Sequence, residues 1–129
     1  MHETGTARRS ILVVDDDAQV RSVVSETLRL EGHAVDVAED GRHAVEKLGR
    51  CRFDLIITDL LMPEKEGLET ISEIRRTDTQ IPIVAISGGG RLGPRYYLDS
   101  ARGMGANATL AKPFGRQELL TTVNDLLPQ

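Results

Sequence analysis

Short apolar runs alternate with helical patterns five times along this chain of 129 residues. Residues 11–14, 55–57 and 81–86 are almost continuously apolar, which is typical of central strands covered by helices on both faces. Residues 33–38 alternate between apolar and polar side chains, which favours an edge strand, and residues 108–111 form a weaker run that we expect at the other edge. This order predicts an α/β domain of repeated βα units around a parallel sheet.

The segments between these runs carry apolar side chains at helical spacing. Pro94 and Gly103 are placed to begin and end a fourth helix. Gly32 is placed to end the first helix, whose apolar stripe consists of Val20, Val23, Val24, Thr27 and Leu28. Residues 1–9 are polar and lack periodicity, so we expect a flexible leader followed by one domain over residues 10–129.

Composition and charge argue against two classes of partner. The net charge of -4 and the aromatic content of 3% do not suit direct binding of nucleic acid. No apolar run approaches the ~18 residues of a membrane span. Arg8 and Arg9 precede an apolar run that is too short for a signal peptide. We therefore expect a cytoplasmic protein that binds neither nucleic acid nor membranes directly.

The cysteine and the histidines predict no metal site. Cys51 is the only cysteine, so an intramolecular disulfide cannot form, and we expect a half-buried structural thiol at a helix end. His2, His33 and His43 show no ligand spacing relative to one another, and we expect each of them at the surface.

Polar side chains follow four of the predicted strands. Functional groups of an open parallel sheet gather at the carboxyl ends of its strands, where this chain places Asp15, Asp16, Asp17, Asp59, Ser87 and Lys112. Each residue also has a simpler interpretation. Asp17 is suited to cap a helix, Asp59 could be a loop carboxylate, Ser87 a turn residue and Lys112 a solvated charge. Their joint placement favours a shared site.

Phosphoryl transfer onto a carboxylate fits this set of groups. Neighbouring carboxylates repel one another unless a cation joins them, and oxygen-only ligands favour Mg²⁺. The metal ion and Lys112 would stabilise the oxygens of the transferring group while a carboxylate oxygen attacks in line. A hydroxyl at Ser87 could then donate a hydrogen bond to one phosphoryl oxygen.

Four motifs resemble those of the response-regulator receiver family of two-component signal transduction, the CheY-like superfamily. They are ILVVDDD at residues 11–17, ITDLLMP at 57–63, AIS at 85–87 and KPF at 112–114. The resemblance covers residues 10–127, and four motifs in this order are highly specific. It implies a flavodoxin-like, doubly wound (βα)5 sandwich of three layers with a parallel sheet of order 2-1-3-4-5.

The resemblance also implies a function and a set of site residues. The protein would be a phosphoacceptor switch, not an enzyme, that receives a phosphoryl group from a histidine kinase or a histidine phosphotransfer protein and then changes its binding of a downstream protein. Asp59 would be the phosphoacceptor, and Ser87 and Lys112 would bind the phosphoryl group. Mg²⁺ would be held by Asp15, Asp16, Asp59 and the backbone carbonyl of Leu61, and the bond between Lys112 and Pro113 would be cis.

The chain departs from the family pattern at several positions. Thr109 replaces an aromatic residue that normally moves with the switch, and Tyr96 or Tyr97 could substitute, although packing or surface roles explain them more simply. The glycine-rich residues 88–93 predict a mobile loop that responds to phosphorylation. Leu61 and Gly89 cannot orient a water molecule for hydrolysis of the acyl phosphate, so we expect slow self-dephosphorylation.

Three alternatives remain open from the sequence. Gly88, Gly90 and Gly93 spell the G-x-G-x-x-G of a dinucleotide-binding turn, but they follow the fourth strand and not the first. Asp15 and Asp17 resemble the nucleophile motif of haloacid-dehalogenase phosphatases, but a later acidic motif is missing. The third alternative is a receiver fold kept as a binding scaffold without phosphorylation.

Overall fold

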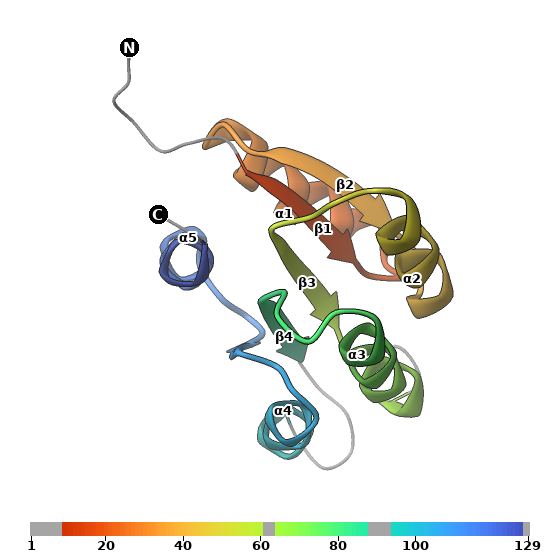
Figure 1. Cartoon of the computed structure of the whole chain (residues 1–129). Helices are drawn as coiled ribbons and strands as arrows, with labels where there is room; N and C mark the ends of the chain where they lie inside the picture. The colour runs from red at the N-terminus through yellow and green to blue at the C-terminus, as the bar shows by residue number, and fades with distance from the viewer. Residues whose placement is uncertain (1–8, 61–63, 88–93, 128–129) are drawn as a thin grey trace.

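The computed structural model describes residues 9–60, 64–87 and 94–127, and, within the helices, no side chains of residues 64–68 and 94–98. Strands and helices alternate strictly along the chain (Figure 1). In chain order they are β1 (Ser10–Val14), α1 (Ala18–Leu30), β2 (Ala34–Ala38), α2 (Gly41–Arg50), β3 (Leu55–Asp59), α3 (Glu64–Thr77), β4 (Ile83–Ser87), α4 (Pro94–Gly103), β5 (Ala108–Ala111) and α5 (Arg116–Leu126).

The strands form one parallel sheet of order β2-β1-β3-β4-β5. This result confirms the predicted repeat, both edge strands and the sheet order that the resemblance implied. Gly32 ends α1 with a φ of 93°, a left-handed conformation that suits glycine. The predicted limits of α4 are also confirmed.

Helices cover both faces of the sheet and bury two separate apolar clusters. On one face Val24 and Leu28 of α1 and Leu119 and Val123 of α5 pack on strand residues such as Ile57. On the other face residues of α2, α3 and α4 pack on the alternate strand residues, among them Ala44, Ile71, Ile74, Ala101, Leu12 and Ile56. Successive strand residues point to opposite faces, so continuous apolar runs serve both clusters.

Two surface predictions were wrong. His33 was expected at the surface, but the turn between α1 and β2 buries it to 5% exposure, and its N–H donates to the carbonyl of Leu28. Cys51 was expected to be half-buried, but it is exposed just after α2 ends. Both residues lie in connections, where burial depends on the path of the turn and not on a periodic pattern. Within the described residues, no helix is long and apolar enough to cross a membrane.

Candidate functional site

Two buried carboxylates lie side by side at the carboxyl edge of the sheet. Asp15 directly follows β1, and Asp59 is the last residue of the neighbouring strand β3. Each residue is 2% exposed. The parallel register that pairs Val14 with Thr58 brings these two strand ends together. The fold therefore buries two acidic side chains next to each other.

Asp16 completes a group of three, which we call the aspartate cluster (Asp15, Asp16 and Asp59). One carboxylate oxygen of each residue lies within 4.8 Å of those of the other two, and Asp16 is the exposed member. Asp17 does not belong to the cluster. Its side chain accepts hydrogen bonds from the N–H groups of Gln19 and Val20, so its simpler interpretation as the cap of α1 is confirmed.

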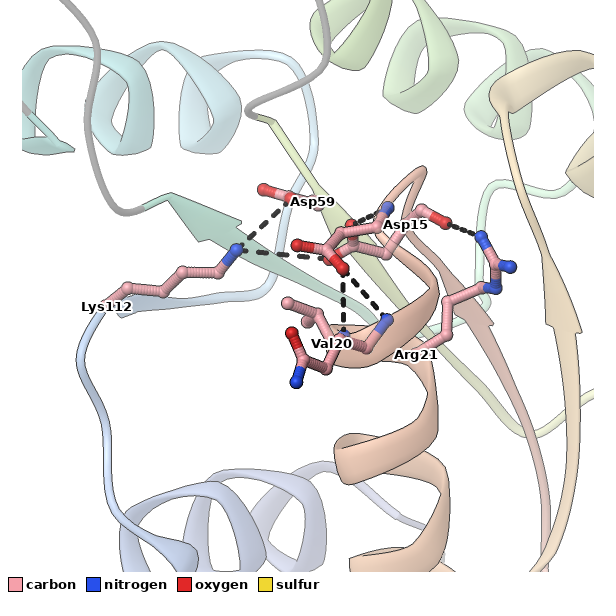
Figure 2. Close-up of polar contacts among 7 residues, drawn as sticks. Asp15, Val20, Arg21, Asp59 and Lys112 are labelled. Atoms are coloured by element: carbon pink, nitrogen blue, oxygen red, sulfur yellow. Dashed lines mark hydrogen bonds and ion pairs between the residues drawn. The ribbon is translucent and has the colours of Figure 1, made fainter.

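Lys112 reaches the aspartate cluster from the end of β5 (Figure 2). Its Nζ lies 3.3 Å from Oδ2 of Asp59 and 4.0 Å from Oδ2 of Asp15. The peptide bond between Lys112 and Pro113 is cis, as the resemblance implied. Lys112 is half-buried, so its ammonium group acts on the two carboxylates with less screening than an exposed charge would.

One ammonium group does not balance the aspartate cluster. The pKa of Asp15 is raised to about 7, mainly by burial and also by the nearby Asp59, although a backbone hydrogen bond from Asp17 and the charge of Lys112 lower it. Three carboxylates that offer only oxygen ligands, one of them open to solvent, suit a hard divalent cation such as Mg²⁺. A bound cation would offset both the cost of burying these charges and the repulsion between Asp15 and Asp59.

Ser87 ends β4, next to Asp59 in the sheet order. It pairs with Ala111, the residue before Lys112, and its carbonyl accepts from the N–H of Lys112. The side chain is fully buried, and among the described residues its Oγ has no hydrogen-bond partner. A buried hydroxyl of this kind is unusual and retains the capacity to donate a hydrogen bond.

Several predicted residues lie outside the described part of the chain. They include Leu61, whose carbonyl was expected to bind the metal ion, and the glycine-rich residues 88–93, to which Gly89 belongs. Tyr96 and Tyr97 lie in α4, but their side chains are not described. Thr109 is described and half-buried, and its Oγ1 accepts a hydrogen bond of 3.4 Å from Nη2 of Arg102 in α4.

Two features beside the aspartate cluster were not found from the sequence. A groove of about 570 Å³, the α1–α5 groove, extends from Lys112 between α1 and α5, and it is lined by apolar side chains such as Val20, Val23 and Phe114. Arg21 of α1 donates a hydrogen bond of 2.7 Å from Nη1 to the main-chain carbonyl of Asp15. No sequence pattern signals either feature, because both depend on how α1 packs.

Comparison with known proteins decides the family of the chain. The model of the response regulator receiver domain matches residues 11–124. The chain belongs to this family. This membership decides against the dinucleotide-binding and haloacid-dehalogenase alternatives, and the family acts as a phosphoacceptor switch.

Curated relatives of this receiver domain include the response regulators MprA of Mycolicibacterium vanbaalenii and of Mycobacterium leprae. Both are 36% identical over 118 residues, which cover 91% of this chain and 49% and 50% of the relatives. The chain thus spans about half the length of these relatives.

Solved receivers share the fold. The chemotaxis protein CheY4 of Vibrio cholerae superimposes with a TM-score of 0.83 at 34% identity, over 94% of this chain and 100% of that one. The response regulator TrrA of Thermotoga maritima, in complex with Mg²⁺-BeF, superimposes with a TM-score of 0.80 at 34% identity, over 92% and 99% of the two chains.

Proposed function

We propose that this receiver domain, residues 10–129, accepts a phosphoryl group on Asp59 from a histidine kinase or a histidine phosphotransfer protein, with Mg²⁺ bound in the aspartate cluster. The proposal rests on one observation above all, the meeting of three carboxylates and one ammonium group at the carboxyl edge of the sheet. The complex of the relative TrrA with Mg²⁺-BeF supports the choice of metal ion.

Asp59 is better placed than Asp15 to be the nucleophile. Its Oδ2 is the nearer of the two to Lys112, at 3.3 Å against 4.0 Å. It ends a strand that lies between the strands of Asp15 and Ser87. Oδ1 of Asp15 is already engaged by the N–H of Asp17 at 2.8 Å. We therefore assign Asp15 and Asp16 to hold the metal ion and Asp59 to attack.

The transfer itself is a single displacement. A carboxylate oxygen of Asp59 forms a bond to phosphorus while the bond between phosphorus and the donor imidazole nitrogen breaks, and that nitrogen keeps the electron pair. Asp15, Asp16 and Asp59 would hold Mg²⁺, which when bound would supply positive charge that balances the transferring group. Lys112 holds a positive charge at Asp59, and the Oγ of Ser87 is available to donate a hydrogen bond to the arriving group.

The remaining parts of the proposal concern binding. The carbonyl of Leu61 would add a further metal ligand. The donor would approach the carboxyl edge of the sheet, where the α1–α5 groove adjoins Lys112.

After the transfer the phosphoryl group would stay on the side chain of Asp59 as an acyl phosphate. The domain would therefore act as a switch for a downstream protein in the cytoplasm and not as an enzyme.

A mass measurement tests this function. The wild-type protein and the variants Asp59→Asn and Asp125→Asn are incubated with acetyl phosphate and Mg²⁺, and their intact masses are compared. We expect the wild type and Asp125→Asn, a change at an exposed position of α5, to gain one phosphoryl group. Asp59→Asn should gain none, because an amide is not a nucleophile for this step. Equal gains by Asp59→Asn and the wild type would contradict the proposal and favour a scaffold role or another acceptor.

A further inference from the structure

The short connection between β1 and α1 carries two of the three members of the aspartate cluster. Asp15 is anchored in the sheet by its N–H, which donates to the carbonyl of Ala38 at 3.1 Å. Asp16 follows it, is exposed, and has a like-charged neighbour on each side in the sequence. Like charges repel, so the carboxylate of Asp16 stays near those of Asp15 and Asp59 only if the backbone on both sides of it is fixed.

Arg21 bonds to the backbone on both sides of Asp16. Its guanidinium Nη1 donates to the carbonyl of Asp15 at 2.7 Å (Figure 2). Its backbone N–H makes a helical hydrogen bond to the carbonyl of Asp17 at 3.0 Å. The guanidinium contact joins residues that are six positions apart. It therefore closes the turn between the strand and the helix around Asp16.

From these contacts we infer that Arg21 is a positioning residue for the metal ion, which fixes the turn of residues 15–17 so that Asp16 and Asp15 face Asp59. The inference rests on the proposed function, because it assigns a role toward the divalent cation. A charged donor on a buried carbonyl makes a short, strong hydrogen bond. Groups that orient metal ligands typically change metal affinity about tenfold or more when they are removed.

The positive charge of Arg21, taken alone, predicts a change in Mg²⁺ affinity of the opposite sign. Arg21 is a positive charge beside a site for cations, so its removal would strengthen Mg²⁺ binding if only electrostatics mattered. Positioning predicts weaker binding. The sign of the change in affinity therefore separates the two explanations.

Arg29 provides a matched control on the same helix. Its Nη2 donates to the carbonyl of Val35 at 3.1 Å, which is the same kind of contact at the other end of α1. Mg²⁺ is titrated into the unphosphorylated wild type, Arg21→Gln and Arg29→Gln, and Kd is obtained from amide chemical shifts. We expect Kd to rise about tenfold for Arg21→Gln and to change less than about twofold for Arg29→Gln.

Hydrogen exchange of the Asp17 amide gives a second readout that needs no metal ion. This N–H donates to Oδ1 of Asp15 at 2.8 Å inside the turn, so we expect it to exchange faster in Arg21→Gln than in Arg29→Gln. If Arg21→Gln does not fold, Arg21→Lys, which keeps the charge but not the planar fork of donors, is tested in its place.

The outcomes separate the inference from the proposed function. A folded Arg21 variant with a Kd equal to or below that of the wild type, or with unchanged exchange at Asp17, would overturn the role of Arg21 alone. A wild-type protein that does not bind Mg²⁺ at all would overturn the proposed function and the inference together.

Discussion

The two edges of the sheet hold polar clusters of opposite character. At the carboxyl edge, Asp15 and Asp59 are buried together, and Lys112 is the ammonium group that faces them. At the amino edge, Arg75 of α3 reaches the turn between α4 and β5, where its guanidinium meets main-chain carbonyls and the side chain of Asn107. Burial lowers the pKa of Arg75, yet its donors have partners.

The amino-edge cluster is closely bonded. Nε and Nη2 of Arg75 donate to the carbonyl of Gly105 at 3.1 and 2.9 Å, Nη1 donates to the carbonyl of Asp78 at 3.2 Å, and Nη2 also donates to Oδ1 of Asn107 at 2.7 Å. The same oxygen of Asn107 accepts from the N–H of Ile83 at 2.9 Å. Gly105 has a φ of 120°, and an added Cβ there would lie 2.9 Å from Arg75.

This difference shows that the amino edge of the sheet contributes to stability, whereas the carboxyl edge carries the candidate site at a cost in stability. Bonded polar groups at the amino edge tie α3, β4 and the turn before β5 together, so they stabilise the fold. The buried carboxylates at the carboxyl edge oppose folding, because burial disfavours their charged form, and a bound cation would offset this cost. Substitutions at the two edges should therefore change stability in opposite directions.

The largest expected loss of stability comes from Arg75→Met. It leaves the carbonyls of Gly105 and Asp78 and the amide of Asn107 without their charged donor, and we expect the free energy of unfolding to fall by about 2–3 kcal/mol. Urea denaturation measures this loss. Arg76→Met, an exposed neighbour, should change the free energy of unfolding by less than about 0.5 kcal/mol. The Mg²⁺ affinity of Arg75→Met should equal that of the wild type. A clear loss of affinity would contradict the conclusion that the two edges act independently.

A smaller effect should appear at His33, which also lies at the amino edge. Burial lowers the pKa of His33, assisted by Arg9 and opposed by Glu31. Its neutral form is therefore favoured by folding, so its contribution to stability is complete above pH 6.5 and is lost as the pH falls below 6.5. On acidification from pH 7.5 to pH 5, the raised pKa of Asp15 adds stability in both proteins, whereas His33 takes stability away only in the wild type. The free energy of unfolding should therefore increase more in His33→Gln than in the wild type.

His43→Gln is the control for this prediction. His43 is half-buried at the start of α2, away from the turn that holds His33, and an equal effect of its substitution would show that the change is not specific to the buried imidazole. If the free energy of unfolding changes by the same amount in His33→Gln and in the wild type between the two pH values, the buried imidazole does not contribute.

The strands, the helices and the edge of the sheet where polar side chains gather were predictable from the sequence, whereas individual tertiary contacts were not. Apolar periodicity set the strands and helices, and the geometry of parallel sheets placed Asp15, Asp59 and Lys112 at one edge. The order of the strands came from the family resemblance. The contacts of Arg21 and Arg75 with main-chain carbonyls depend on how turns pack against helices, which no spacing encodes. The burial of His33 was missed for the same reason.

The central claim is that the negative charge of the buried carboxylates destabilises the carboxyl edge, and Asp15 is the residue at which it is tested. The pKa of Asp15 is raised to about 7 in the folded protein from an ordinary value of 3.8, so the folded state retains a proton that the unfolded state loses. Stability therefore falls as the pH rises from about 4 through 7, by up to about 4 kcal/mol above pH 7. Asparagine at this position removes the charge.

The most direct test is urea denaturation of the wild type and Asp15→Asn at pH 8, without and with saturating Mg²⁺. We predict that Asp15→Asn is the more stable protein without metal ion, by about 2–4 kcal/mol. Mg²⁺ should stabilise the wild type and have a much smaller effect on the variant, since a ligand stabilises only the state that binds it. An Asp15→Asn variant that is no more stable than the wild type without metal ion, or that gains as much from Mg²⁺, would contradict the claim.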